Sequence, residues 1–199
     1  MGDHYYTEKP NVESKRERIT ETIAGETLQF YVDRGVFSKA GLDFGTRLLL
    51  ESFEPPTLTG SYLDVGCGWG PIGITLAKLN PGLEIYMVDI NKRAVELSIE
   101  NGKMNGVKNI NVFQNNLLSG FTEKFAVVLT NPPIRAGKEI VFRLYEQAAA
   151  SLLTNGELWV VIQKKQGAPS TITKLVELNL EVDVVKKSKG YFIIRGKNR

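Results

Sequence analysis

Residues 62–73 read YLDVGCGWGPIG, a short apolar segment that runs into a turn with several glycines. Glycine adopts backbone conformations that other residues avoid, and it leaves room for a ligand to approach the main chain. A strand, a glycine-rich turn and a helix in this order are typical of loops that bind nucleotide-like ligands in α/β proteins. We therefore expect a ligand-binding loop at residues 66–70.

Strands and helices alternate around and beyond this loop. We expect strands at 62–65, 84–88, 109–113, 125–130 and 158–162, and helices at 72–79, 92–104, 139–153 and 171–179. Two last strands, at 182–186 and 191–195, would pair as a hairpin around Ser188-Lys189-Gly190. This alternation predicts an α/β fold: a Rossmann-like, doubly wound sheet of seven strands, mostly parallel, with one antiparallel strand in the C-terminal hairpin. Such sheets bind ligands beyond the carboxyl ends of their strands.

The part of the chain before residue 62 is less regular. Residues 1–25 are polar, and we expect an N-terminal arm that is flexible or contains a short helix at 14–23. Residues 26–199 would form the domain itself, with an N-terminal segment at 26–60 that carries a strand at 27–32 and a helix at 42–53. The single histidine, His4, lies in the arm, and we assign it no catalytic role.

The composition excludes several classes of protein. The 199 residues fit one domain, and the single cysteine, Cys67, allows neither a disulfide framework nor a cysteine-based metal site, so we expect no metal. No apolar run is long enough to span a membrane, and the first residues do not resemble a secretory signal. We expect a cytoplasmic protein and favour a monomer.

The glycine-rich turn is compatible with two kinds of ligand. Gly68, Gly70 and Gly73 satisfy the dinucleotide pattern G-x-G-x-x-G, and Asp89 follows at the end of the next strand. However, Asp64 precedes the glycines, where its carboxylate would repel a pyrophosphate but attract a cationic amino-acid group, directly or through water. This favours S-adenosylmethionine (SAM) as the cofactor, and a nicotinamide-dependent oxidoreductase is the alternative.

Residues 131–134 read NPPI and come directly after the strand expected at 125–130. Two prolines stiffen the backbone and remove two N–H donors, so hydrogen-bond acceptors dominate this turn: the side-chain oxygen of Asn131 and the carbonyl of Pro132. If both hydrogens of an exocyclic amine bind these acceptors, the lone pair localises on its nitrogen and attacks a methyl group in line. We therefore predict methyl transfer from SAM to an amino nitrogen, with Asn131 and Pro132 as the catalytic residues.

The glycine-rich loop, Asp89 and the Asn-Pro-Pro turn resemble motifs of the class I SAM-dependent methyltransferases. The resemblance implies that Asp89 binds the ribose hydroxyls and that Asn116, or Asn115 beside it, binds the adenine amino group. The sequence departs from the family at Ile134, where an aromatic residue usually stacks on the target base, and Phe37 is our candidate for that stacking. The implied substrate site includes Pro133, Ile134 and Phe37. The implied cofactor site consists of Asp64, Gly66, Cys67, Gly68, Gly70, Asp89, Ile90, Asn115, Asn116 and Asn131.

Four further segments narrow the resemblance: residues 35–38, 41–43, 45–46 and 190–192, which read GVFS, GLD, GT and GYF. With the Asn-Pro-Pro turn, they resemble the small-subunit ribosomal RNA guanine-N2 methyltransferases over residues 27–196. The resemblance implies methylation of guanine N2 in that RNA. Those enzymes often carry an additional N-terminal domain, so we expect a stand-alone catalytic domain here. The alternatives are a protein glutamine N-methyltransferase, which uses the same acceptors on an amide, and a non-catalytic RNA-binding relative.

Positive charge is clustered, although the formal net charge is only +3. Lysines and arginines group near residues 15–18, 135–138, 164–165, 186–189 and 195–199. Arg135, Lys138 and Lys164 would lie on the loops after the fourth and fifth strands of the sheet, beside the predicted pocket. Because phosphate contacts position a nucleic acid without reading its sequence, we expect these side chains to bind the backbone of an RNA partner.

Overall fold

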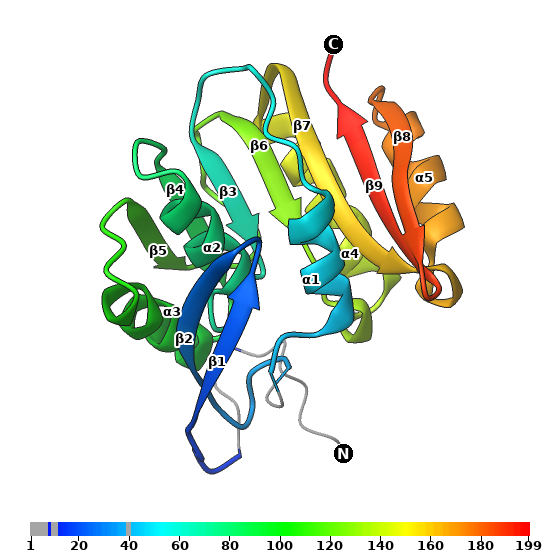
Figure 1. Ribbon diagram of the computed structural model, residues 1–199. Helices are drawn as coiled ribbons and strands as arrows, with labels where there is room; N and C mark the ends of the chain where they lie inside the picture. Colours follow the sequence, from blue (N-terminus) through cyan, green and yellow to red (C-terminus); the bar gives the residue numbers. More distant parts are fainter. Residues whose placement is uncertain (1–7, 9–11, 39–40) are drawn as a thin grey trace.

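The computed structural model describes residues 8, 12–38 and 41–199, so His4 and most of the first eleven residues of the expected arm lie outside the described chain. The strands are β1 (Glu17–Ile23), β2 (Glu26–Val32), β3 (Tyr62–Val65), β4 (Ile85–Asp89), β5 (Ile110–Gln114), β6 (Phe125–Thr130), β7 (Leu152–Gln163), β8 (Glu181–Ser188) and β9 (Tyr191–Lys197) (Figure 1). The helices are α1 (Phe44–Ser52), α2 (Pro71–Leu79), α3 (Lys92–Met104), α4 (Lys138–Ser151) and α5 (Ala168–Glu177), with short 3-10 turns η1 (Ile134–Ala136) and η2 (Lys164–Gln166). Within these ranges, no helix combines the length and the apolar character that a membrane span requires.

Seven of the described strands form one sheet in the order β5-β4-β3-β6-β7-β9-β8. The strands from β3 to β7 pair in parallel, whereas β9 runs antiparallel to both β7 and β8. The prediction of a doubly wound sheet with one antiparallel strand in a C-terminal hairpin is therefore confirmed. Apart from β7, the expected strands and helices from residue 26 onward end within about three residues of the observed ends.

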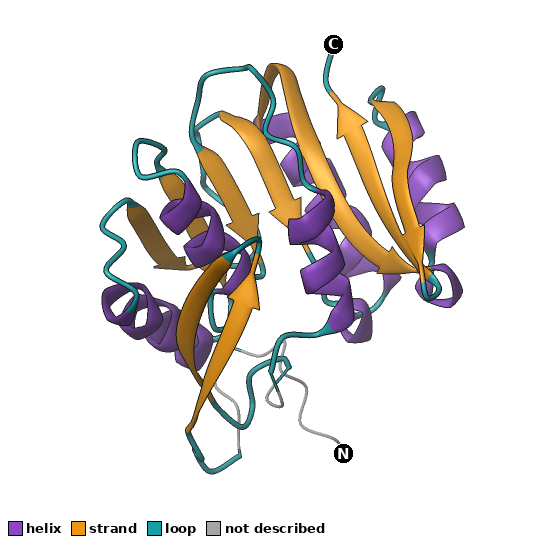
Figure 2. Cartoon of the chain, viewed as in Figure 1, coloured by secondary structure: helices purple, strands orange, loops and turns teal. Residues whose placement is uncertain are grey.

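Helices cover both faces of the sheet (Figure 2). Helices α1, α2 and α3 share one hydrophobic core with the separate β1–β2 hairpin, and α4 and α5 pack in a second core on the other face. In β6, Val127 and Leu129 belong to the first core, and Val128 between them belongs to the second. Because neighbouring residues of a strand point to opposite faces, a strand covered on both sides is mainly apolar, as β6 is from Phe125 to Leu129.

The N-terminal part of the chain contains a strand in place of the expected flexible arm or short helix. Strand β1 pairs antiparallel with β2 along its whole length. Ala24 and Gly25 join the two strands, both with positive φ (50° and 86°), which suits a two-residue hairpin turn. The inner face of β1 carries Glu21, whose carboxylate forms a 2.7 Å ion pair with Arg47 of α1. Because this carboxylate stands at an inward-facing position, β1 lacks the regular alternation of polar and apolar residues that predicts a strand. The division of the chain at residue 25, which falls in this turn, stays a prediction.

Helix α4 ends earlier, and strand β7 begins earlier, than the sequence pattern predicts. The helix stops at Ser151, and Asn155 lies inside β7 with a φ of 64°. The pairing of β6 with β7 shifts register at this place, so β7 contains a bulge. Asn155 and Gly156 exchange backbone hydrogen bonds of 2.8 and 2.9 Å with Asn198. A left-handed Asn followed by Gly occurs both at helix ends and at bulges, and here pairing with Asn198, just after β9, selects the bulge.

Two asparagines fasten the β1–β2 hairpin to the rest of the domain. The Nδ2 of Asn101, in α3, donates to the carbonyls of Tyr31 (2.9 Å) and Trp69 (2.8 Å), and its Oδ1 accepts the N–H of Tyr31 (2.7 Å). Asn105, one helical turn later, makes the matching pair of bonds with Gln29 (3.0 and 2.7 Å). Since Trp69 belongs to the glycine-rich loop, Asn101 connects the hairpin, the helix and that loop.

Asn101 is fully buried and Asn105 is partly exposed, so the two positions form a matched pair. We expect Asn101→Ala to lower the free energy of unfolding by about 3 kcal/mol, because the buried backbone groups of Tyr31 and Trp69 lose their partner. Asn105→Ala should cost about 1 kcal/mol or less, because water replaces the amide. Denaturant titration of both variants measures the two losses. Equal losses would contradict this explanation.

Candidate functional site

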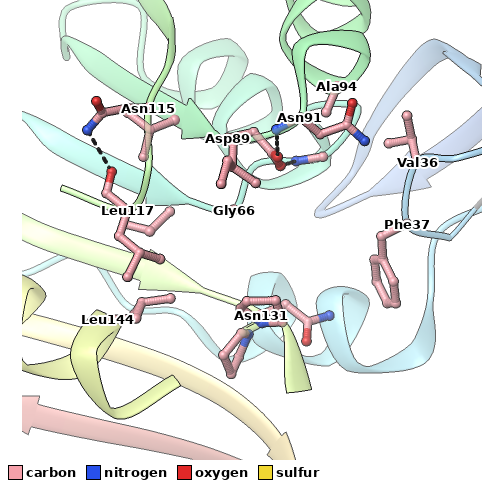
Figure 3. A pocket seen from close by; sticks show the side chains of 16 residues that line it. Val36, Phe37, Gly66, Asp89, Asn91, Ala94, Asn115, Leu117, Asn131 and Leu144 are labelled. Carbon is pink, nitrogen blue, oxygen red and sulfur yellow. Dashed lines mark hydrogen bonds between the residues drawn. The ribbon is translucent and has the colours of Figure 1, made fainter. Parts of the chain in front are cut away.

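A pocket lies at the edge of the sheet where strands β3 to β6 end (Figure 3). This is the edge at which doubly wound sheets bind ligands. Val36 and Phe37, from the loop after β2, close one side of the pocket, and Leu144 of α4 lies near the other. The lining residues are Val36, Phe37, Val65, Gly66, Gly68, Val88, Asp89, Ile90, Asn91, Ala94, Asn115, Leu117, Asn131, Pro132, Pro133 and Leu144.

The glycine-rich loop contributes its backbone to this pocket. Gly66 and Gly68 have φ values of 75° and 58°, in the left-handed region that side chains disfavour. A Cβ added to either glycine would meet no atom within 4 Å, so both positions face open space. The N–H groups of Gly66 and Cys67 both bind the carbonyl of Val88, at 2.8 and 3.0 Å. The loop is therefore anchored to β4 and offers a bare backbone to a ligand.

Asp89 stands at the end of β4 and lines the same pocket. One carboxylate oxygen accepts the N–H of Gly68 at 2.9 Å, and the other accepts the N–H of Asn91 at 2.8 Å. Burial raises the pKa of Asp89 to about 6, although hydrogen bonds from the Asn91, Gly68 and Ile90 backbone act in the opposite direction. Each oxygen keeps lone pairs for a further donor in the pocket.

Asp64 does not line the pocket, contrary to the direct contact that the sequence allowed. Its side chain is fully buried beneath the loop, and one oxygen accepts the N–H of Gly73 at 3.0 Å. Its other oxygen has no hydrogen-bond partner among the described residues. Burial, and then the nearby charge of Asp89, raise the pKa of Asp64 to about 7. Alternation along β3 points this carboxylate into the protein, where it holds the start of α2.

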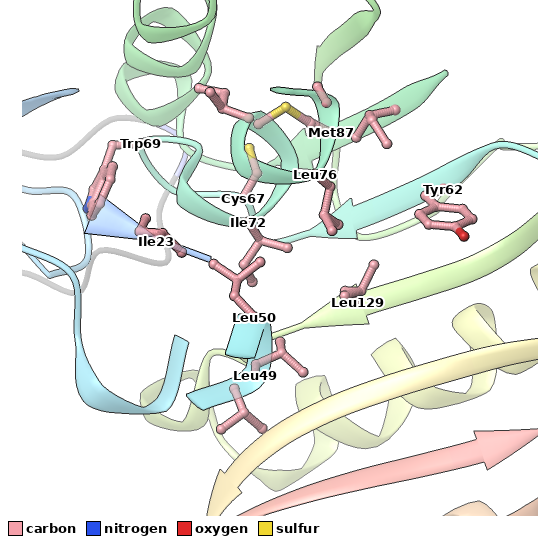
Figure 4. Close-up of a cluster of buried hydrophobic side chains, with 14 of the residues drawn as sticks. Ile23, Leu49, Leu50, Tyr62, Cys67, Trp69, Ile72, Leu76, Met87 and Leu129 are labelled. Carbon is pink, nitrogen blue, oxygen red and sulfur yellow. The ribbon is translucent and has the colours of Figure 1, made fainter. Parts of the chain in front are cut away.

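Cys67 and Gly70 also lie outside the pocket lining. The Cys67 side chain points into the hydrophobic core near Ile72 and Met87 (Figure 4), and burial raises the pKa of its thiol. Gly70 precedes α2, where an added Cβ would come within 2.5 Å of Ile74 Cδ1. The loop thus alternates between positions that face the ligand space and positions that pack inward, which a motif match does not distinguish.

The structure selects Asn115, rather than Asn116, as the pocket residue after β5. Asn115 lines the pocket, and its Nδ2 donates to the carbonyls of Leu117 (2.9 Å) and Ser119 (3.0 Å). These bonds occupy both amide hydrogens and leave the Asn115 oxygen as an acceptor. Asn116 is exposed and does not line the pocket. Ile90, the other residue expected beside Asp89, does line it.

The turn after β6 is rigid and presents acceptors. The Pro132 carbonyl accepts the N–H of Ile134 at 2.9 Å across Pro133, whose φ and ψ of −75° and 76° form an inverse γ-turn. A carbonyl oxygen has two lone pairs, so Pro132 can accept one more hydrogen bond. The hydroxyl of Thr130 donates to the carbonyl of Val65 at 2.9 Å and fastens the turn to β3.

A wider groove adjoins the pocket and shares four residues with it: Val36, Phe37, Asn131 and Pro132. Phe37 is 39% exposed, so much of its ring faces the groove. The Tyr191 hydroxyl accepts a 2.6 Å hydrogen bond from Gln163 on the far side. The remaining lining residues are Val12, Arg34, Gly35, Ser38, Asp43, Ile134, Arg135, Gln163, Gln166 and Tyr191. The structure thus places Phe37, Ile134 and Arg135 around one groove, whereas Pro133, predicted for the same substrate site, lines the pocket instead.

Several pocket residues carry no chemistry that the sequence could reveal. Val36, Ala94, Leu117 and Leu144 supply apolar walls from four separate segments. Asn91 is the N-cap of α3, and its Oδ1 accepts the N–H of Arg93 at 3.0 Å. Its Nδ2 also donates to the Gly35 carbonyl at 2.8 Å, which holds the loop after β2 over the pocket. The sequence signal that could have identified Asn91 as a pocket residue is its position shortly after Asp89, the acidic residue that ends β4.

The basic clusters divide into two groups. At the chain ends, arginines pair with carboxylates: Arg16 with Glu100 (2.7 Å), Arg195 with Asp183 (2.7 Å) and Arg199 with Glu181 (3.1 Å). Around the groove lies a second group of lysines and arginines, which we name the basic rim. Within the described ranges, none of its members forms an ion pair with a carboxylate. Neighbouring cavities that share Gln163, Gln166 and Ile134 connect its members. The basic rim consists of Arg135, Lys138, Lys164, Lys165 and Lys189.

Fold and site together define the class of protein. The sheet order with antiparallel β9, the glycine-rich loop after β3, the acid that ends β4 and the Asn-Pro-Pro turn after β6 are those of class I SAM-dependent methyltransferases. The family model of the methyltransferase small domain matches residues 27–195. The chain belongs to this family, and its cofactor is SAM.

Relatives in sequence include one match along the whole chain. The protein is 52% identical over 199 residues to the uncharacterised protein YbxB of Bacillus subtilis (strain 168), with 99% of both chains covered. It is 40% identical over 131 residues to ribosomal RNA small subunit methyltransferase C of Aeromonas hydrophila subsp. hydrophila. That match covers 64% of this chain and 37% of the relative, so the chain spans less than half the length of that enzyme.

Solved structures resemble this fold closely. The T. thermophilus 16S rRNA N2 G1207 methyltransferase (RsmC), in complex with AdoMet and guanosine, matches with a TM-score of 0.81 and 23% identity. The match covers 96% of this chain and 52% of that one. The ribosomal protein L11 methylase of Lactobacillus delbrueckii subsp. bulgaricus matches with a TM-score of 0.67 and 23% identity, over 78% of this chain and 79% of that one. At these identities the likeness shows the fold alone.

Proposed function

We propose that this protein transfers a methyl group from SAM to an exocyclic amino nitrogen, namely N2 of a guanine in small-subunit ribosomal RNA. One observation carries the proposal: Asn131 and Pro132 line both the pocket and the adjoining groove. A cofactor in the pocket and a base in the groove would therefore meet at this turn. The turn offers acceptors to whatever enters from the groove.

The residues of the pocket fit the cofactor. Gly66 and Gly68 leave an open cradle of backbone, in which a methionine moiety would lie. The Asp89 carboxylate would accept both ribose hydroxyls, since two adjacent donors match its two oxygens. The Asn115 oxygen would accept the adenine amino group, and Leu117 and Leu144 would pack on the ring. When bound, SAM supplies an electrophilic methyl group on a sulfonium.

The turn would prepare the amine for attack. The Asn131 oxygen and the free lone pair of Pro132 would each accept one amine hydrogen. These bonds hold the nitrogen lone pair out of conjugation with the ring and aim it at the pocket. The second amine hydrogen leaves as a proton to water after the nitrogen has gained its methyl group. Phe37, exposed in the groove, would stack on the base where Ile134 cannot, worth about 1–3 kcal/mol.

The substrate class rests on relatives and on charge. The curated relatives that match the chain at 34–40% identity are named ribosomal RNA small subunit methyltransferase C, and the RsmC structure contains guanosine. The basic rim lies beside the groove and suits an RNA backbone. Together these observations favour guanine in RNA over a protein glutamine. A cytoplasmic location and a monomeric state stay predictions.

Nucleoside analysis tests this function. The purified protein is incubated with tritiated SAM and either small-subunit ribosomal RNA or intact small ribosomal subunits, and the RNA is digested for mass spectrometry. We expect label in the RNA fraction and N2-methylguanosine among the nucleosides. Label on another nucleoside would correct the target atom, and label on a protein glutamine would replace the substrate class. No label in either fraction, with SAM bound, would favour a non-catalytic relative.

Substitutions in the basic rim test how the protein holds RNA. We expect Lys164→Ala with Lys165→Ala to weaken RNA binding and to reduce the slope of log affinity against log salt by about 0.7–0.9 for each phosphate that the variant no longer neutralises. The matched control replaces Lys103 and Lys108, which lie beside β5 at the opposite edge of the sheet. Filter binding over a salt series measures both slopes. Equal slopes for the two double variants would place the RNA elsewhere.

A further inference from the structure

We propose that Asp43 is a positioning residue that fixes the side-chain amide of Asn131 so that its oxygen faces the target amine. This inference rests on the proposed function, because it concerns how the acceptor turn is oriented. The two residues are far apart in the sequence and meet through the fold: Asp43 precedes α1, and Asn131 follows β6. Both line the groove.

The contacts of Asn131 determine where the nitrogen and the oxygen of its side-chain amide lie. Its Nδ2 donates to Thr46 Oγ1 at 3.0 Å and lies 3.3 and 3.4 Å from the two carboxylate oxygens of Asp43. A carboxylate accepts hydrogen bonds and cannot donate them. If the amide rotated by half a turn, its oxygen would face the negative charge of Asp43. The carboxylate therefore excludes the rotated form.

The orientation matters because an amide has an acceptor at one end and two donors at the other. With both hydrogens of Nδ2 directed at Asp43 and Thr46, the Asn131 oxygen remains available, and no hydrogen bond to it exists among the described residues. In the rotated form, an NH₂ group would face the NH₂ group of the target. Two donors repel, and the amine lone pair would stay delocalised into its ring.

The local structure explains why a carboxylate stands at residue 43. Asp43 is the N-cap of α1, and its Oδ1 accepts the N–H of Thr46 at 3.1 Å. The partial positive charge at the start of the helix favours an ionised group there. Gly45 allows Tyr191 of the groove to approach, since an added Cβ would lie 2.7 Å from Tyr191 Cε1. The segment therefore holds the carboxylate against Asn131.

A helix cap alone would explain Asp43 without any role at the turn, and a swap of the two side chains separates these explanations. Asparagine is also a good N-cap, so Asp43→Asn keeps the cap. Asn131→Asp brings two carboxylates together, at positions now 3.3 Å apart. In the double variant Asp43→Asn with Asn131→Asp, the amide at position 43 donates to the carboxylate at position 131. That carboxylate still accepts the target amine.

The experiment measures kcat and KM for methyl transfer to small-subunit ribosomal RNA in the three variants. We expect kcat to fall about 100-fold in Asn131→Asp, with SAM affinity little changed. The double variant should regain about tenfold or more, since residues in direct contact couple by amounts of this order. A cap without a positioning role predicts additive losses. A double variant as slow as Asn131→Asp would therefore overturn the proposal.

A second measurement does not depend on activity. In Asn131→Asp, the two adjacent carboxylates raise the pKa of one of them in the folded state. As pH rises from about 4 to 8, this variant should therefore lose more stability than the unsubstituted protein, in which the buried Asp64 and Asp89 already cause a loss. The double variant has one carboxylate in the pair and should lose no more stability over this range than the unsubstituted protein. Thermal unfolding over that pH range reports the coupling even if no methyl reaches RNA.

If transfer fails but the coupling is present, the proposed function fails and the pairing stands. If Asn131→Ala abolishes transfer but the swap gives no rescue and no pH effect, the proposed function stands and this inference fails.

Discussion

Asn131→Ala should lower kcat for methyl transfer by about 100- to 1000-fold, the usual cost of removing one preorganised group that stabilises developing charge. In the proposed mechanism the Asn131 oxygen is one of two acceptors for the amine, and the other, the Pro132 carbonyl, cannot be removed by a side-chain substitution. Without Asn131, the amine hydrogen returns to water or stays unpaired, and the nitrogen lone pair remains in the ring. The effect should appear in kcat, because the bond strengthens as the nitrogen becomes positive.

Single-turnover assays with tritiated SAM measure this loss, and calorimetry measures SAM affinity in parallel. SAM affinity should stay within about threefold, because Asn131 lies at the margin of the pocket shared with the groove. Asn111→Ala is the control for loss of an amide, since Asn111 lies in edge strand β5, away from the groove. Normal turnover by Asn131→Ala would remove the role assigned to the turn.

The central sheet was predictable because its signals are local. Strand β6 is buried at every position and apolar from Phe125 to Leu129, and a run of this kind before a Pro-Pro turn has few other interpretations. The turn at Lys189 and Gly190, with φ values of 46° and 80°, follows from the preference of such hairpins for left-handed residues. The sheet and its antiparallel strand therefore follow from segments shorter than ten residues.

The N-terminal hairpin was not predictable in the same way, because distant residues satisfy its polar groups. Glu21 is tolerated on the inner face of β1 because Arg47 and the N–H of Leu42 bind it, at 2.7 and 3.0 Å. Asn101 supports β2 from a helix about seventy residues away. Neither partner is visible in a short window of sequence, so the polar residues suggested a solvated arm.

The candidate site was predictable in its chemistry and less so in its geometry. The motif identified the loop, but the direction of each side chain decided which members reach the pocket: Gly66 and Gly68 do, and Asp64 and Cys67 do not. The choice between neighbouring asparagines after β5 depended on a turn at Leu117, whose φ is 53°. Asp43 and Asn131 are far apart along the chain, so no local sequence pattern indicates their contact.

SAM affinity should depend on pH through Asp89, whose pKa burial raises to about 6. If Asp89 accepts the ribose hydroxyls as proposed, they need the ionised carboxylate, so SAM would bind the deprotonated form and lower this pKa further. As pH falls through 6, the free protein takes up a proton that binding must release, and Kd should rise about tenfold between pH 7 and pH 5.

In Asp89→Asn, this rise should disappear, and affinity should be about 100-fold weaker throughout, because an amide accepts at one end only. Calorimetric titration from pH 5 to 8 measures both proteins. The same pH profile in the two proteins would mean that Asp89 does not bind the ribose.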